Sequence, residues 1–134
     1  MQQIFVDTGA WFAFLNAADP DHNPVAELME SWNNRLITTD YIFDELVTLV
    51  RYRIGHSEAC RAGEFLRSRA ITDIIAVGPA DIEQAWRQFA KHADKQYSFT
   101  DCTSFCIMRR LGIRQAIAVD PDFRRAGFIV LPEN

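Results

Sequence analysis

The sequence of 134 residues has few of the features that mark membrane, secreted or fibrous proteins. No apolar run approaches the roughly 20 residues needed to span a bilayer. The N-terminal MQQIFVD has neither the basic flank nor the long apolar stretch of a signal peptide. Internal repeats, low-complexity tracts and long linkers are also absent. We therefore expect a cytoplasmic protein with no membrane partner, and one domain over residues 1–134 whose core draws on its 49% hydrophobic residues.

Cysteine and histidine are scarce and are not spaced as metal ligands. The three cysteines, Cys60, Cys102 and Cys106, form no C-x-x-C pair. Cys102 and Cys106 lie four residues apart in one helical pattern, which predicts core thiols rather than a disulfide framework or a zinc site. The three histidines are scattered along the chain.

Positive charge is also not in excess. The chain has 14 basic and 18 acidic residues and a formal net charge of -4, which counts against broad nucleic-acid binding. If four of the acids held a metal ion, the remaining acids would balance the basic residues, and local arginine patches would be available for phosphate. The candidates for phosphate contact, each with a solvated helix face as the alternative, are Arg51, Arg53, Arg109, Arg110, Arg124 and Arg125.

Short apolar runs that lean towards β-branched residues alternate with longer helical patterns. The runs predict strands at residues 4–6, 36–38, 74–77, 117–119 and 128–131. The patterns between them predict helices at residues 10–16, 24–33, 41–54, 57–69, 79–92 and 100–111. Alternating strands and helices predict the α/β class, as a three-layer α/β/α sandwich with a mostly parallel five-stranded sheet.

Acidic residues follow two of the predicted strands. Asp7 comes after IFV and Asp120 after AIAV, and acids at the carboxyl ends of parallel strands meet at one edge of the sheet. In the helix after residues 36–38, Glu45 borders the apolar stripe and can point to the same crevice, whereas Asp44 is a surface charge. Taken singly, Asp7 could be a helix N-cap, Glu45 a surface acid and Asp120 the first residue of a turn.

A fourth acid, Asp101, stands in the segment YSFTDCTSF at the start of an apolar helical pattern. Ser98 and Asp101 form the S-x-x-D pattern of a capping box, which is the alternative to a functional role. Two unit charges about 4 Å apart repel by about 4 kcal/mol at an effective dielectric of about 20, so a cluster of the four acids needs a cation. Acid-only ligands favour Mg²⁺ or Mn²⁺, and such a site can activate water for attack on a phosphodiester.

Four segments in order resemble the PIN-domain family, and most closely its VapC-like toxin members. They are VDTGAWFAFL, TTDYIFDELVTLVR, YSFTDCTSF and AIAVDPDFRRAGFIVL, and they are spread over almost the whole chain. The resemblance implies a PIN-like fold and a Mg²⁺- or Mn²⁺-dependent endoribonuclease that cleaves RNA phosphodiesters. It also implies a small antitoxin protein as partner, a homodimer, and four catalytic metal ligands, which are Asp7, Glu45, Asp101 and Asp120.

The same resemblance implies roles for residues beside these acids. The chain has DPDF where many relatives resemble D-x-H-F, so Asp122 is an outer ligand, a water-mediated contact or only a turn residue. Thr8 and Thr100 adjoin ligand acids and are expected to support them by orienting a carboxylate or contacting phosphate. Asp94 is expected to fix the loop before the helix of Asp101.

Other functions remain as alternatives. A PIN-fold nuclease that processes RNA without an antitoxin, or a PIN fold that mainly binds a partner, fits the same motifs. A haloacid-dehalogenase-like phosphatase is disfavoured because no second aspartate stands two residues after Asp7, and a receiver domain because no lysine follows Lys95. Candidates for a partner surface, with core packing as the alternative, are Trp11, Phe12, Phe14 and Trp32.

Overall fold

The computed structural model describes residues 2–133 of the chain. Strands within these residues form one sheet in the order β3-β2-β1-β4-β5, and each neighbouring pair is parallel. The strands are β1 (Ile4–Val6), β2 (Leu36–Thr39), β3 (Thr72–Ile75), β4 (Gln115–Ile117) and β5 (Ile129–Leu131). The predicted five-stranded parallel sheet is confirmed.

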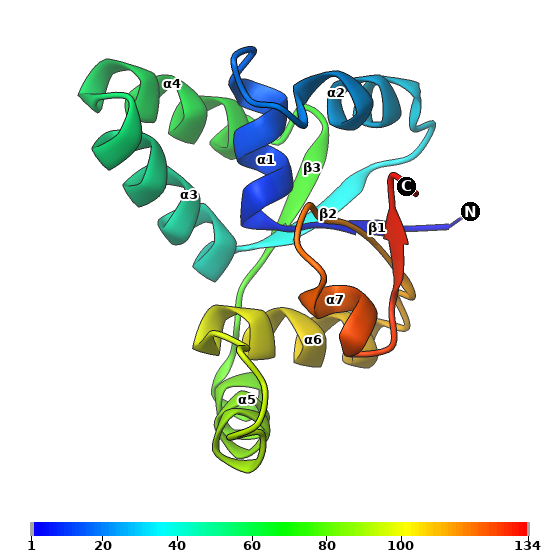
Figure 1. Cartoon of the computed structure of the whole chain (residues 1–134). Helices are drawn as coiled ribbons and strands as arrows, with labels where there is room; N and C mark the ends of the chain where they lie inside the picture. Colours follow the sequence, from blue (N-terminus) through cyan, green and yellow to red (C-terminus); the bar gives the residue numbers. More distant parts are fainter. Residues whose placement is uncertain (1, 134) are drawn as a thin grey trace.

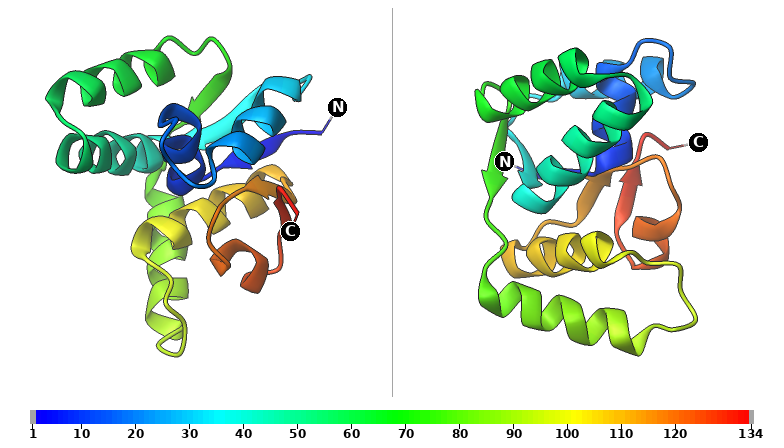
Figure 2. Two further views of the ribbon diagram at one scale, coloured as in Figure 1. Left: turned by 45° about the horizontal axis from the view of Figure 1, so that its top comes forward. Right: turned by 90° about the vertical axis from the view of Figure 1, so that its left-hand side faces the viewer.

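Two sets of helices cover the two faces of this sheet (Figure 1, Figure 2). The chain winds from β1 through β2 to β3, then returns to β4 and β5 on the other side of β1. Because parallel crossovers are right-handed, this reversal moves the connecting helices to the opposite face. The first face has α1 (Thr8–Leu15), α2 (His22–Ser31), α3 (Asp40–Arg53) and α4 (His56–Arg67). The second face has α5 (Pro79–Lys91), α6 (Phe99–Leu111) and α7 (Asp122–Arg125), which confirms the three-layer sandwich.

The core surrounds β1, the central strand. Ile4, Phe5 and Val6 are all fully buried, which explains why this strand is an unbroken apolar run rather than an alternating one. Phe5 stacks on Phe123 of α7, with ring centroids 6.1 Å apart. Burying one such side chain stabilises the fold by about 1.5 to 3 kcal/mol. The strand is therefore a fixed base for the residue that follows it, Asp7.

The four aromatic residues near the N-terminal helices pack against the core. Trp11 is fully buried, and its indole Nε1 donates a hydrogen bond of 3.2 Å to Oγ1 of Thr38. Phe12 is also buried, while Phe14 and Trp32 are partly buried against the same core. Core packing, the alternative to a partner surface, is thus the main use of these side chains.

The predicted helix ends lie within about two residues of the observed ones, but two strands are displaced. The strand predicted at residues 74–77 spans residues 72–75, because the amide of Val77 leaves the sheet and donates to Oδ1 of Asp40. The strand predicted at residues 117–119 spans residues 115–117, and α7 was not predicted at all. Within residues 2–133, no helix has the length and apolar character needed to cross a membrane.

Candidate metal and nucleic-acid site

Asp7 lies where the two halves of the sheet meet. Its backbone N–H donates 3.1 Å to the carbonyl of Ile117, which joins the end of β1 to the end of β4. Asp7 takes the N-cap position of α1, but its side chain makes no capping hydrogen bond. The residue is 4% exposed, and its Oδ1 is a buried atom with no hydrogen-bond partner. The N-cap alternative therefore accounts for the backbone position of Asp7 but not for its carboxylate.

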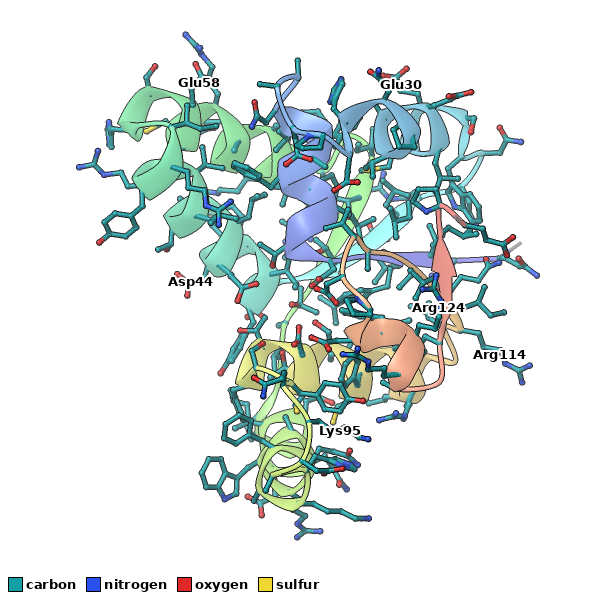
Figure 3. All side chains as sticks on the ribbon, viewed as in Figure 1. Glu30, Asp44, Glu58, Lys95, Arg114 and Arg124 are labelled. Atoms are coloured by element: carbon teal, nitrogen blue, oxygen red, sulfur yellow. The ribbon has the colours of Figure 1, made fainter. Side chains whose placement is uncertain are left out.

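Glu45 comes to this edge from the first turns of α3. Thr39 starts the helix by accepting a hydrogen bond of 3.1 Å from the amide of Ile42. Further along, the carboxylate of Glu45 accepts a hydrogen bond from the hydroxyl of Thr8. Thr8 thus orients the carboxylate of Glu45, and its support of a metal ligand stays a prediction. Asp44 is exposed on the outer side of α3, as expected for a surface charge (Figure 3).

Asp101 is held by the start of α6. Its amide donates 2.9 Å to the hydroxyl of Ser98, and its Oδ2 accepts 3.0 Å from the amide of Ser98. The predicted capping box is therefore present. It uses only one carboxylate oxygen, so capping and metal binding are compatible in the same residue.

Asp120 lies in the loop between β4 and α7, three residues after the strand ends. Its Oδ1 accepts a hydrogen bond of 2.9 Å from the amide of Asp122, so the predicted turn is present as well. Asp122 itself interacts with Arg125 at 3.5 Å. Asp122 is also close enough for its charge to raise the pKa of Asp101 and Asp120, so its role as an outer ligand, a water-mediated contact or a turn residue stays a prediction.

Burial and mutual repulsion raise the pKa of three of the acids. For Asp7, burial is the largest cause, and the charges of Asp101 and Asp120 add to it, so that its pKa lies well above the ordinary value. Burial raises the pKa of Asp101 to about 6, although the amide of Ser98 counteracts it. Burial also raises the pKa of Asp120. Four segments distant in the sequence therefore bring their carboxylates close enough to repel one another, since Glu45 also raises the pKa of Asp7.

The donor set fits a hard divalent cation. All the side chains are carboxylates, and the buried Oδ1 of Asp7 has no hydrogen-bond partner. Among residues 2–133, however, no three acidic, histidine or cysteine side chains are already arranged around one point as a metal cage. Each of the other three acids turns one carboxylate oxygen to a protein donor, which is Thr8, Ser98 or the amide of Asp122. Mg²⁺ keeps several of its waters and so needs only a few direct carboxylate ligands.

The remaining predicted residues have more local contacts. The carbonyl of Thr100 accepts a hydrogen bond of 2.6 Å from the hydroxyl of Thr103, and this contact reveals no supporting role for the Thr100 side chain. Asp94 pairs with Lys95 at 3.4 Å in the loop before α6, so its interaction is within that loop.

The candidate arginines differ in their surroundings. Arg110 forms hydrogen bonds of 2.9 and 3.2 Å with Asp81, and Arg109 lies over the ring of Phe128 at 5.2 Å. Arg53 lies 5.7 Å from the ring of Phe12. Arg124 instead lines a cavity of about 240 Å³ together with Asp120, and Figure 3 places it at α7. Arg125 is also close to this acid, because its charge counteracts the rise in the pKa of Asp120.

Gly9, two residues after Asp7, and Val119, directly before Asp120, were not among the predicted residues. A Cβ atom on Gly9 would lie 2.7 Å from Cγ2 of Val119. The only signal in the sequence was a glycine directly before the helical pattern predicted at residues 10–16, and the contact joins segments about 110 positions apart.

The chain is similar to known proteins over nearly all of its length. A family model described as PIN domain matches residues 4–129. The 23S rRNA-specific endonuclease VapC20 of Mycobacterium tuberculosis is 39% identical over 132 residues, which are 97% of this chain and 99% of that protein. Ribonuclease VapC26 of the same species is 30% identical over 117 residues, which are 87% of this chain and 86% of that protein.

Solved structures share the same fold. The crystal structure of M. tuberculosis VapC20, described as a sarcin-ricin loop cleaving toxin, has a TM-score of 0.89 at 37% identity and covers 94% of this chain and 96% of its own. VapBC2 from Rickettsia felis, bound to a DNA fragment, has a TM-score of 0.69 at 12% identity, with 96% and 97% covered. The second likeness shows the fold alone.

Proposed function

This chain belongs to the PIN-domain family, and we propose that it is a divalent-metal-dependent endoribonuclease and the toxin of a toxin–antitoxin pair. The observation that carries the metal site is the buried carboxylate of Asp7, which has an oxygen without a partner and stands beside Asp101 and Asp120. Burying a carboxylate in this way is costly unless a cation joins it. The names of the relatives VapC20 and VapC26 support ribonuclease activity.

Each of the four acids would contribute a carboxylate oxygen to the ion. Asp7 would bind Mg²⁺ or Mn²⁺ with its unpartnered oxygen, and Glu45, Asp101 and Asp120 would use the oxygens left free by their protein donors. When bound, the ion would lower the pKa of a water so that the water can attack a phosphodiester. Its positive charge would also stabilise the negative charge that develops on the phosphate. Thr8 keeps the carboxylate of Glu45 oriented, and Arg124 is placed to hold a phosphate of the RNA beside Asp120.

Two neighbouring residues on α3 test the metal-dependent nuclease. Glu45→Gln removes a ligand acid, so RNA cleavage in Mn²⁺ should fall at least about 100-fold. Asp44→Asn removes an exposed charge one position earlier and should leave cleavage unchanged. The substrate is an RNA containing the sarcin-ricin loop, since VapC20 is described as cleaving it, with transfer RNA alongside. Equal cleavage by wild type and Glu45→Gln would attribute the activity to a contaminant.

An antitoxin needs a surface on which to dock. Between α1, α3 and α4 lies a cavity of about 260 Å³ with an apolar wall and a rim that includes Glu58 and Arg61. Such a cleft suits an apolar anchor from a small protein partner. The apolar lining residues are Phe12, Leu15, Val50, Ile54, Ala62 and Phe65.

A homodimer needs a self-complementary surface, and the outer side of α5 is the candidate. Trp86 is 56% exposed and stacks on Phe89, with ring centroids 5.9 Å apart. Ile82 is exposed on the same side of the helix. Aromatic residues exposed together are typical of interface centres.

Two alternatives keep the PIN fold but change the role. A nuclease that processes RNA without an antitoxin would cleave RNA, yet no small protein would copurify with it from its host. A module that mainly binds a partner would copurify with one but would not cleave RNA in Mn²⁺. The pair of assays therefore separates the three roles.

A further inference from the structure

The first turn of α1 lies against the loop between β4 and α7. Asp7 and Thr8 lead into this turn, and Gly9 is the second residue of the helix. On the other side, Val119 directly precedes Asp120. A Cβ atom on Gly9 would lie 2.7 Å from Cγ2 of Val119, well below the about 3.5 to 4.0 Å of favourable carbon contacts. The backbone at Gly9 and the Val119 side chain are therefore packed closely together.

The backbone conformation at this position does not require glycine. The φ angle of Gly9 lies outside the left-handed region, unlike those of Gly112 and Gly127, at 71° and 99°. Within a regular helix, glycine is less favourable than alanine. The close approach of Val119 is thus the physical reason for a glycine here.

The loop opposite Gly9 has little freedom to move away. The amide of Ala118 donates 3.2 Å to the carbonyl of Leu131, and the amide of Asp122 donates 2.9 Å to the Asp120 side chain. The Val119 side chain is 42% exposed, but its branching at Cβ restricts its rotation about χ1. A methyl group at Gly9 would therefore be accommodated in part by a shift of the segment that includes Asp120.

We propose that Gly9 and Val119 form a spacer contact that sets how closely the carboxylates of Asp7 and Asp120 approach, and that Gly9 is a positioning residue for their shared divalent ion. The proposal rests on the metal-dependent function above and names a residue that touches neither the ion nor the RNA. Mg²⁺ demands near-ideal octahedral geometry with ligands at about 2.0 to 2.1 Å. A displacement of about 0.5 Å between two of its ligands is therefore enough to weaken binding.

Four variants test the contact through Mn²⁺ affinity, measured by calorimetry. Gly9→Ala is expected to weaken Mn²⁺ binding about tenfold, and RNA cleavage should fall with it. Val119→Ala alone should change the affinity less than about twofold. The double variant with both alanines should return to within about twofold of wild type, because the second change makes room for the first. Gly63→Ala is the matched control, since a Cβ on this helical glycine in α4 meets Val47 and Phe43 at ordinary distances of 3.5 and 3.6 Å.

Each outcome of these measurements either supports or overturns the proposed role of the Gly9–Val119 contact. Wild-type affinity in Gly9→Ala would overturn the proposal, and so would a double variant that stays about tenfold weaker, because the loss would then not come from Val119. If Gly9→Ala fails to fold, recovery of both folding and Mn²⁺ affinity in the double variant still supports the contact, and failure to recover them overturns it. A wild-type protein that neither binds Mn²⁺ nor cleaves RNA would instead overturn the proposed function, and the spacer contact with it.

Discussion

At the scale of single residues, Asp7 combines two opposing features. It follows the fully buried central strand, so packing determines its position. Its carboxylate is buried, has an oxygen without a partner, and has a pKa raised by burial and by Asp101 and Asp120. A side chain that lowers the stability of the metal-free fold and yet occupies the centre of the sheet edge is typical of a functional site.

This conflict predicts that removing the charge stabilises the protein when no metal is present. Asp7→Asn should raise the free energy of unfolding in chelator by about 1 to 3 kcal/mol, because a buried, repelled carboxylate is replaced by a neutral amide. Urea unfolding at pH 7 measures the difference. Adding Mn²⁺ should stabilise the wild type and not the variant, since a ligand that binds the folded state adds stability by mass action. A variant that is less stable than wild type in chelator would contradict the prediction.

The same acids give the metal-free protein a pH dependence with a definite sign. A raised pKa in the folded state means that the folded protein binds the proton more tightly than the unfolded chain. Stability is then greatest below the unfolded pKa of about 4 and is lost as pH rises through the folded pKa, which for Asp101 is about 6. In chelator, the free energy of unfolding of the wild type should therefore rise from pH 7 to pH 5. That of Asp7→Asn should rise by less over the same range.

At the scale of elements, two neighbouring helices each have a capping carboxylate at their third residue, and only one of these helices is at the site. Ser98 and Asp101 cap α6, while the carboxylate of Asp81 caps α5 by accepting 3.1 Å from the amide of Gly78 and also pairs with Arg110. Ser98→Ala and Asp81→Ala should each lower the free energy of unfolding by about 1 to 2 kcal/mol. Only Ser98→Ala should also weaken Mn²⁺ binding, because it removes the hydroxyl that accepts from the amide of Asp101 and so loosens the backbone that carries this ligand. If Ser98→Ala and Asp81→Ala bind Mn²⁺ with the same affinity, the Ser98 cap serves only the stability of the helix.

The elements themselves were predictable because their apolar patterns are local. Ile4 to Val6 are apolar without interruption, as a central parallel strand requires, and the S-x-x-D pattern marked the start of α6. Strand ends were less predictable, because hydrogen bonds to distant residues determine them. The end of β4 depends on the amide of Ala118, which donates to Leu131, and no local pattern indicates this contact.

The same distinction applies to the site. The positions of Asp7 and Asp101 follow from a strand end and a helix start, so the sequence predicted the edge of the sheet at which they lie. The hydrogen bond from Thr8 to Glu45 joins residues 37 positions apart, and the contact of Gly9 with Val119 joins more distant ones. Such contacts depend on how α1 packs against α3 and on the path of the loop after β4, which side-chain periodicity does not specify.

At the scale of the whole molecule, the proposed homodimer is tested by a substitution on the outer side of α5. Trp86→Ala should convert a dimer into a monomer at micromolar concentration or weaken it at least about tenfold, because truncating an aromatic side chain at an interface centre costs about 2 kcal/mol or more. Light scattering over a concentration series measures the change. Tyr52→Ala is the matched control, since Tyr52 is 85% exposed on α3 and has no aromatic neighbour among the residues described.

One other outcome has a distinct meaning for this surface. A Trp86→Ala protein that stays dimeric but binds the RNA more weakly would assign the aromatic face of α5 to the substrate, because exposed aromatic rings also stack on unpaired bases. Phe99 links the aromatic face of α5 to the start of α6, which carries Asp101. Its ring lies 6.5 Å from that of Trp86, and it is two residues before Asp101. A dimer formed through α5 would place a second copy beside Phe99 at the start of α6, and loss of the dimer should lower cleavage without changing Mn²⁺ affinity.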